Sequence, residues 1–176
     1  MTCVLTETGT VCPVSTALEV VGDPWTLLIL RELFGGATRF DDIQVQTETP
    51  TQELFARLDS LEQNGLIFVA RQGSVAYGLT EKGRAIYPMI YALRAWGEKW
   101  TKPEGSDYAV RFTHKYCGTD VGLDAVCRRC GVPVERAHLE PTMSPEWKAE
   151  RARRQEKSRA AKEIAVETDS SMRDVG

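Results

Sequence analysis

Hydrophobic positions recur with helical spacing through most of the first hundred residues. The pattern predicts four helices, over residues 15–21, 25–34, 39–46 and 50–63. Two short β-prone runs follow at 66–71 and 75–79, and residues 72–74 join them in a tight hairpin. A long final helix is predicted from Glu81 to Trp100. A helix-turn-helix followed by a two-stranded wing and a long helix indicates an α+β, mainly α, winged helix-turn-helix fold.

Residues with known capping roles mark two of the helix starts. Asp23 is a good N-cap, and Pro24 suits the first helical position because proline lacks the N–H that this position leaves unbonded. Thr49 is the expected N-cap of the fourth helix, with Pro50 at its first position and Gln52 completing a capping box. The leucines of that helix lie on one face, so that face packs on the core.

Composition divides the chain into four segments. We expect a flexible N-terminus over residues 1–11, the winged helix over 12–104, a cysteine-rich module over 107–141 and a charged tail over 144–176. The tail has few large apolar residues, so a solvated charged helix over 147–165 that frays into disorder is the simplest expectation. A nucleic-acid-binding arm is the alternative for the tail.

Charge is distributed unevenly along the 176 residues, which carry a net charge of −3. The first 65 residues hold 3 basic and 10 acidic side chains. Neither a membrane-spanning apolar run nor a secretion signal is recognisable, so we expect a cytoplasmic protein. The sequence also lacks a Ser/His/Asp set, a phosphate-binding glycine loop and an open metal position, which argues against an enzyme.

Several short motifs between residues 12 and 100 carry a resemblance to a known family. They are Cys12-Pro13-Val14, Ala17-Leu18, Trp25-Thr26-Leu27-Leu28-Ile29-Leu30-Arg31-Glu32-Leu33, Arg39-Phe40, Arg57-Leu58, Leu61-Glu62, Gly65-Leu66, Tyr77-Gly78-Leu79-Thr80, Gly83 and Leu93-Arg94-Ala95-Trp96-Gly97. With these motifs the segment resembles the HxlR family of bacterial winged-helix transcription regulators. The resemblance implies a regulator that forms a homodimer through its first helix and the helix 81–100, and that binds an inverted-repeat operator in double-stranded DNA. Some members sense oxidants or electrophiles through a cysteine near the first helix, a place that Cys12 occupies here.

By this resemblance, the helix that begins at Thr49 is the recognition helix and enters the major groove. The candidate DNA-binding residues are Arg39, Thr49, Thr51, Gln52, Arg57 and Arg71. Gln52 is the best candidate for reading a base edge, and the arginines are candidates for phosphate contacts. Arg57 has an alternative role as an ion-pair partner of Glu53 or Asp59.

The acidic first half leaves a second function open. Duplex binding draws much of its affinity from Lys and Arg that neutralise phosphates. Asp59 on the recognition helix would repel phosphates, and Phe55 offers no hydrogen bond, although it can touch a thymine methyl group. The alternative function is a winged-helix protein-interaction module with structural zinc and no intrinsic DNA binding.

A His/Cys cluster is the strongest chemical signal in the sequence. His114 and Cys117 form one knuckle, Cys127 and Cys130 form a second, and a glycine follows each. Two-residue gaps let paired side chains converge on one ion, and four filled positions with three thiolates are typical of structural zinc. We therefore expect a zinc-ribbon-like module that holds one structural zinc ion per chain.

Alternatives to this zinc site stay open at the level of sequence. His138 can replace His114 as a ligand, the thiols can be buried without metal, or Cys127 and Cys130 can form a disulfide. The module is expected to place strands at 109–113 and 132–137.

Two further features concern regulation and assembly. A thiol at a helix N-terminus has a lowered pKa, which makes Cys12 a redox candidate; the alternative is a small residue packed near a dimer interface. Trp96 and Trp100 are four residues apart on the long helix, which favours pairing with another chain.

Overall fold

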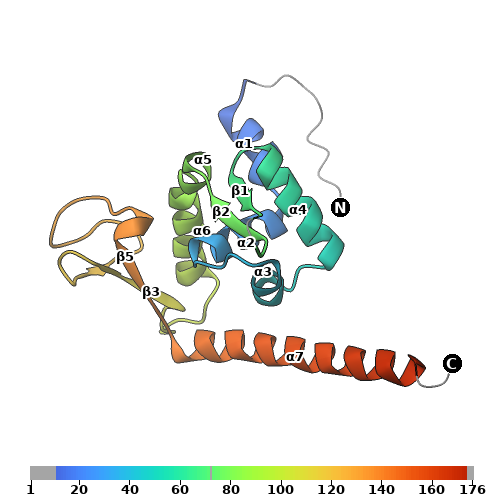
Figure 1. Ribbon diagram of the computed structural model, residues 1–176. Helices are drawn as coiled ribbons and strands as arrows, with labels where there is room; N and C mark the ends of the chain where they lie inside the picture. Colours follow the sequence, from blue (N-terminus) through green and yellow to red (C-terminus); the bar gives the residue numbers. More distant parts are fainter. Residues whose placement is uncertain (1–10, 72, 174–176) are drawn as a thin grey trace. The chain divides into compact units, whose positions relative to one another are not determined.

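The structure is a computed structural model that describes residues 11–71 and 73–173, with side chains as far as Ile164 (Figure 1). The chain divides into two compact units, residues 1–90 and 91–176. The N-terminal segment that was expected to be flexible, residues 1–11, lies outside the described residues apart from Val11.

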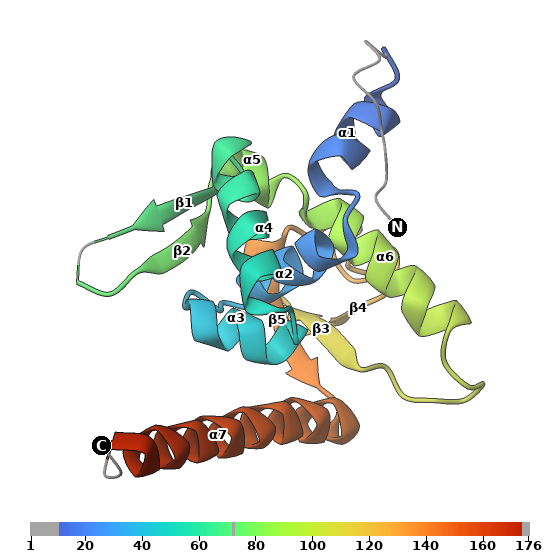
Figure 2. The same cartoon turned by 90° about the vertical axis from the view of Figure 1, so that its right-hand side faces the viewer.

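The first unit is built from helices followed by an antiparallel hairpin. Its elements are α1 (Pro13–Val21), α2 (Pro24–Phe34), α3 (Phe40–Thr47), α4 (Thr51–Gln63), β1 (Ile67–Ala70), β2 (Ala76–Leu79), α5 (Glu81–Arg84) and the start of α6 (Tyr87–Trp100). In the hairpin, Ile67 pairs with Leu79 and Ala70 with Ala76. Figure 2 shows the hairpin extending from the helices as a wing. This order of elements confirms the predicted winged helix-turn-helix.

Aliphatic side chains fix the position of α4. Ile29 and Leu30 of α2 are fully buried, and α2 packs against α3, α4 and β2. Leu54, Leu58 and Leu61 of α4 are buried as their spacing predicted. Burying each of these side chains stabilises the fold by about 1.5–3 kcal/mol, so the core holds α4 with its other face outward.

The two predicted helix starts differ in outcome. Asp23 is the N-cap of α2, as predicted, and its carboxylate accepts a hydrogen bond from the backbone N–H of Thr26 at 3.1 Å. Pro50, not Thr49, is the N-cap of α4, and no side chain caps the N-terminus of this helix. The prediction of a capping box was wrong because Thr49 is buried and its hydroxyl donates to Thr47 Oγ1 at 2.7 Å.

The long helix predicted over 81–100 consists of two helices, α5 and α6, separated by a short break. Pro88 explains the break, because a proline has no N–H to donate and its ring would clash with the carbonyl of Arg84 in a continuous helix. Thr80 caps α5 and accepts a hydrogen bond from the N–H of Gly83 at 3.0 Å.

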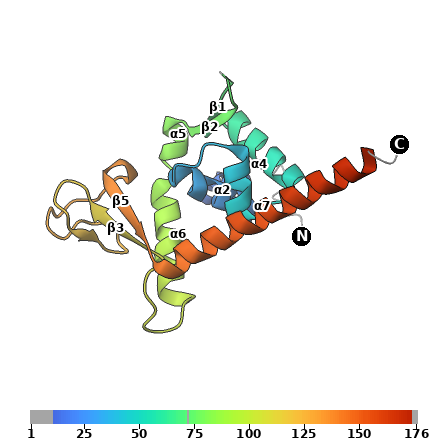
Figure 3. The same cartoon turned by 60° about the horizontal axis from the view of Figure 1, so that its bottom comes forward.

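The second unit combines the remainder of α6 with a small antiparallel sheet and a long helix (Figure 3). Its elements are β3 (Val110–His114), β4 (Asp120–Val121), the 3₁₀ turn η1 (Arg136–His138), β5 (Leu139–Met143) and α7 (Pro145–Arg173), and the sheet order is β4-β3-β5. The strand predicted over 132–137 was wrong: Pro133 removes a backbone donor, and β5 pairs with β3 instead. Helix α7 is longer than the predicted helix at both ends.

Gly83 and Gly97 offer a matched test of this packing. A Cβ at Gly83 would lie 2.0 Å from the carbonyl oxygen of Leu66, whereas a Cβ at Gly97 would meet no atom closer than 3.9 Å. We expect Gly83→Ala to lower the free energy of unfolding by roughly 1–3 kcal/mol, although alanine is the better helix former. Gly97→Ala should raise it by up to about 1 kcal/mol. Urea denaturation followed by circular dichroism measures both, and equal effects of the two variants would contradict the predicted clash.

Candidate nucleic-acid interface and metal centre

Helix α4 presents a polar face opposite its buried leucines. Thr51, Gln52, Phe55 and Asp59 are exposed along this face. Thr51 and Gln52 lie in the first turn, where the backbone N–H groups lack helical partners. Together with α3, this arrangement forms a helix-turn-helix whose second helix is shaped to enter a major groove.

Contacts from α3 order this exposed face. The side-chain amide of Gln44 donates to the hydroxyl of Thr51 at 2.8 Å. The ring of Phe55 stacks on Phe40, with 4.3 Å between ring centroids, yet Phe55 is 57% exposed. Phe55 is therefore a fixed apolar contact on an otherwise polar face, suited to a thymine methyl group.

Arg57 is engaged by carboxylates. Its guanidinium lies 3.2 Å from Asp23 and 3.2 Å from Glu53. Glu53 is one of the two partners considered from the sequence; the other, Asp59, accepts a hydrogen bond from Gln63 at 2.6 Å instead. A phosphate contact from Arg57 would therefore compete with two ion pairs of the protein.

The other candidate DNA-binding residues lie in different environments. Arg39 is exposed directly before α3, and Arg71 is exposed at the wing with its guanidinium 3.9 Å from Glu62. Thr49 is only 2% exposed and its hydroxyl is bonded to Thr47. The side chain of Thr49 is therefore not presented at the surface, which corrects its place among the expected contacts.

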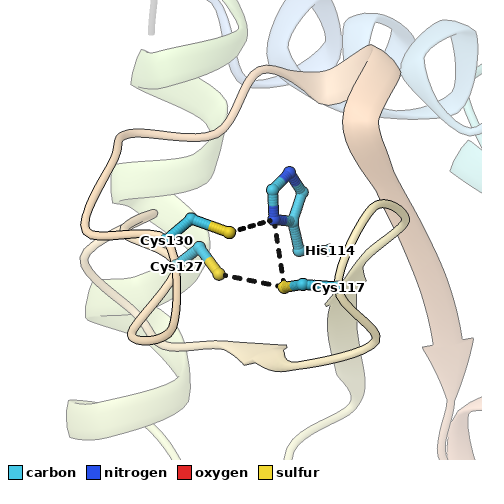
Figure 4. Close-up of side chains that lie close together, drawn as sticks. All are labelled: His114, Cys117, Cys127 and Cys130. Atoms are coloured by element: carbon cyan, nitrogen blue, oxygen red, sulfur yellow. Dashed lines mark hydrogen bonds between the residues drawn. The ribbon is translucent and has the colours of Figure 1, made fainter.

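Four side chains with metal-binding atoms converge in the second unit (Figure 4). Nδ1 of His114 lies 3.3 Å from Sγ of Cys117 and 3.5 Å from Sγ of Cys130. Sγ of Cys117 lies 3.4 Å from Sγ of Cys127. All four candidate ligand atoms lie within 4.8 Å of one another. The structure thus assembles the same four residues that the sequence spacing selected.

Two glycines with positive φ close the knuckles. Gly118 has φ 68° and donates its N–H to the carbonyl of His114 at 2.8 Å; Gly131 has φ 70° and donates to the carbonyl of Cys127 at 2.8 Å. Glycine adopts this left-handed conformation without the steric cost of a Cβ. The same turn therefore follows each half of the cluster.

The donor set fits a tetrahedral zinc ion. With Zn–S bonds of about 2.3 Å and a Zn–N bond of about 2.0 Å, tetrahedral ligand atoms lie about 3.5–3.8 Å apart, close to the 3.3–3.5 Å of the nearest pairs here. His138 is outside this set, and its ring packs edge-on against Tyr116. Cys127 and Cys130 are free thiols in this structure.

The thiols of the cluster differ in protonation. Hydrogen bonds from the hydroxyl and the backbone of Thr119 lower the pKa of Cys117 to about 6. Hydrogen bonds with Cys117 and Cys127 raise the pKa of Cys130 to about 11. The thiol of Cys117 therefore loses its proton more readily than that of Cys130.

The cysteine module is anchored on the C-terminal half of α6. The hydroxyl of Tyr91 donates to the carbonyl of Gly122 at 2.6 Å, and Arg94 lies over the rings of Tyr91 and Phe112. The carboxylate of Glu98 accepts the backbone N–H of Ala109 at 2.9 Å. These contacts join the helix to the strand that carries His114.

Comparison with known proteins identifies the first unit. Residues 20–105 match the model of a family described as HxlR-like helix-turn-helix. Rv3095 of Mycobacterium tuberculosis, named as an HTH-type transcriptional regulator, is 35% identical over 144 residues, which cover 79% of this chain and 90% of Rv3095. The chain belongs to the HxlR-like family.

Other HxlR-like similarities agree. YodB of Bacillus subtilis, an HTH-type transcriptional regulator, is 34% identical over 103 residues, 54% of this chain and 90% of YodB. The crystal structure of PA1607, assigned as a transcription factor, matches with a TM-score of 0.60 and 32% identity over 77% of this chain and 97% of PA1607. The protein is therefore a transcription regulator and not an enzyme. The whole cysteine module and all of α7 lie beyond the HxlR-like match, which ends at residue 105.

Two helices of this HxlR-like protein carry exposed apolar faces. On α1 the exposed side chains are Val14 and Leu18, and on α6 they are Met89, Leu93, Trp96 and Trp100. The buried aromatic residues of α6, Tyr87 and Tyr91, lie elsewhere on the helix. Among the described residues, no helix is both long enough and apolar enough to cross a membrane.

Cys12 is exposed at the N-cap of α1. Hydrogen bonds from the backbone and hydroxyl of Ser15, and from the backbone of Val14, lower the pKa of its thiol. The expectation of a lowered pKa at this helix start is thereby met.

We predict that Cys12 is alkylated by iodoacetamide faster than an ordinary thiol at neutral pH, because the thiolate is the reacting species. Its rate should rise with pH around a midpoint below pH 9, the ordinary pKa of such a thiol. Ser15→Ala should shift this profile toward higher pH. Peptide mass mapping separates Cys12 from the other cysteines, and a profile centred at pH 9 in both proteins would contradict the prediction.

Proposed function

We propose that this HxlR-type regulator acts in the cytoplasm as a homodimer that binds an inverted-repeat operator in double-stranded DNA through α4. The observation that carries the proposal is the exposed face of α4, held outward by its buried leucines. A recognition helix needs this division between a packed face and a polar face that can reach base edges.

The residues proposed to read bases lie near the start of α4. Gln52 is exposed in the first turn, and a glutamine amide can bond both N6 and N7 of adenine. Thr51 is already positioned by Gln44, and Phe55 can meet a thymine methyl group. A/T-containing half-sites are therefore favoured.

The exposed apolar faces of α1 and α6 support dimerisation. Trp96 is 59% and Trp100 is 64% exposed, and tryptophans are enriched where protein interfaces gain most of their affinity. A two-fold dimer reads two half-sites about one helical turn, roughly 34 Å, apart. The same residues in a monomer would leave an apolar stripe in water.

The cysteine module is proposed to hold one structural zinc ion through His114, Cys117, Cys127 and Cys130. Bound zinc would cross-link the two knuckles in a module too small for a large core of its own. His114 is the last residue of β3, and the carboxylate of Glu98 in α6 accepts the backbone N–H of Ala109, directly before that strand. A zinc ion bound by His114 would therefore be connected to α6 through β3.

Cys12 is proposed as the site of response to oxidants or electrophiles. It is exposed, and its thiol has a lowered pKa; both properties favour reaction. Modification at the start of α1 would alter a helix that carries part of the proposed dimer surface.

A second candidate function is a protein-interaction module with structural zinc and no intrinsic DNA binding. The pairing of Arg57 with two carboxylates and the exposed Asp59 favour it. Binding of the wild-type protein to an operator duplex distinguishes the two functions.

For the metal centre, we expect the purified chain to bind one equivalent of Co²⁺ with the thiolate charge-transfer and visible bands of a tetrahedral site. His114→Ala should weaken binding because it removes a ligand, and His138→Ala is the matched control that should leave affinity unchanged. Absorbance titration with competing Zn²⁺ measures both. If His138→Ala weakened binding as much as His114→Ala, the proposed ligand set would be incorrect.

For DNA, we expect saturable binding to a duplex from upstream of the protein's own gene, with two chains per operator by sedimentation. Gln52→Ala should weaken operator binding by about 1–3 kcal/mol, the usual contribution of a base-specific pair, and leave a scrambled duplex unaffected. Fluorescence anisotropy gives the affinities, with Gln63→Ala at the other end of α4 as control.

If the zinc-loaded, dimeric wild-type protein did not bind this duplex at low salt, the result would support the interaction module instead. Equal reductions in affinity for operator and scrambled duplex would show that Gln52 does not read a base.

A further inference from the structure

The first unit offers few cations for phosphates. Residues 11–90 hold six basic and ten acidic side chains. Arg31, Arg57 and Arg71 each lie within 4.0 Å of a carboxylate. Lys82 and Arg84 donate to backbone carbonyls at 2.7 Å. A DNA-binding protein needs Lys and Arg contacts to phosphates for much of its affinity. The first unit therefore has few basic side chains for such contacts.

Helix α7 has the opposite balance. Between residues 145 and 164, where its side chains are described, it carries seven basic and four acidic residues. Along the sequence the two signs alternate, but the helix separates them. At 3.6 residues per turn, four basic positions fall within an arc of about 80° that contains none of these glutamates. They are Lys148, Arg151, Arg159 and Lys162, and we call them the basic stripe.

The basic stripe is accessible. Lys148, Arg159 and Lys162 are exposed. Arg151 is half-buried, with its guanidinium 5.8 Å from the centre of the Trp147 ring. At a rise of 1.5 Å per residue, the stripe extends for roughly 21 Å from Lys148 to Lys162. This length matches several successive phosphates of a duplex.

We propose that the basic stripe of α7 binds the phosphate backbone of double-stranded DNA and supplements the contacts made by the winged helix. This inference rests on the proposed function, since it assigns a second contact to the same regulator. Charge complementarity carries it: the stripe gathers the cations that the first unit lacks. Because such contacts go to phosphates and not to bases, they should add affinity without sequence preference.

A membrane surface fits the stripe less well. Helices that lie in a membrane interface pair a basic face with a broad apolar face. Between residues 145 and 164, the large apolar side chains of α7 are Trp147 and Ile164. Trp147 is moreover flanked by the guanidinium groups of Arg151 and Arg154. The face needed for insertion is therefore lacking on the described part of α7.

The test compares two double variants of the full-length protein with the same change in net charge. Lys148→Gln with Arg159→Gln removes two charges from the stripe, and Arg153→Gln with Lys157→Gln removes two from another side of α7. Glutamine has nearly the helix propensity of lysine and arginine, so α7 should be retained, as circular dichroism verifies. Affinity for the upstream duplex and for a scrambled duplex is measured across a range of salt concentrations.

We expect the stripe variant to reduce the slope of log affinity against log salt by about two, or one for each cation withdrawn from a phosphate. It should weaken both duplexes by the same factor, while the control variant keeps the wild-type slope. An unchanged slope in the stripe variant, or equal reductions in both variants, would overturn the role of α7 and leave the proposed function intact.

Two further outcomes separate the alternatives. If the stripe variant no longer bound anionic phosphatidylglycerol vesicles but kept its duplex affinity, the stripe would belong to a membrane contact and the proposal would be overturned. Failure of the wild-type protein to bind either duplex would contradict the proposed function itself.

Discussion

The burial of α2 against α3 and α4 is the packing interaction on which the DNA-binding unit depends. Ile29 and Leu30 are inaccessible to water, and the leucine row of α4 closes over the same core. Rotating α4 by half a turn would expose those leucines at a cost of several kcal/mol. The core therefore determines that Thr51, Gln52 and Phe55 face outward. Burial of the apolar face thus decides which side chains of α4 are available for recognition.

The two units differ in where their basic side chains lie, and core packing does not require this difference. The winged helix uses its arginines largely within the fold, as Arg57 does with Asp23 and Glu53. The long helix α7 instead places lysines and arginines along one accessible side. The cysteine module stands between these elements in the sequence and is anchored to α6 through Glu98, so a single structural ion there would order the chain that leads to α7. The two proposals therefore assign specific reading and general phosphate attraction to different parts of one chain.

The sequence predicted what periodicity and spacing determine directly. Helices of the first unit, the Asp23 cap and the convergence of His114 with three cysteines followed from local patterns. The prediction failed where the outcome depends on tertiary contacts, as with Thr49, which the fold buries beside Thr47 before α4 begins. It also failed at the break before Pro88, because apolar spacing continues across a helix that the missing N–H interrupts. The basic side of α7 is visible only when positions are projected around the helix, because basic and acidic residues alternate along the sequence.

The most direct measurement of the central claim, that α4 lies in the major groove of an operator, is a dimethyl sulfate footprint on the upstream duplex. Methylation occurs at guanine N7, which the major groove exposes. We predict protection of guanines in two half-sites about one helical turn apart. A saturated complex in which no major-groove guanine is protected would contradict the account.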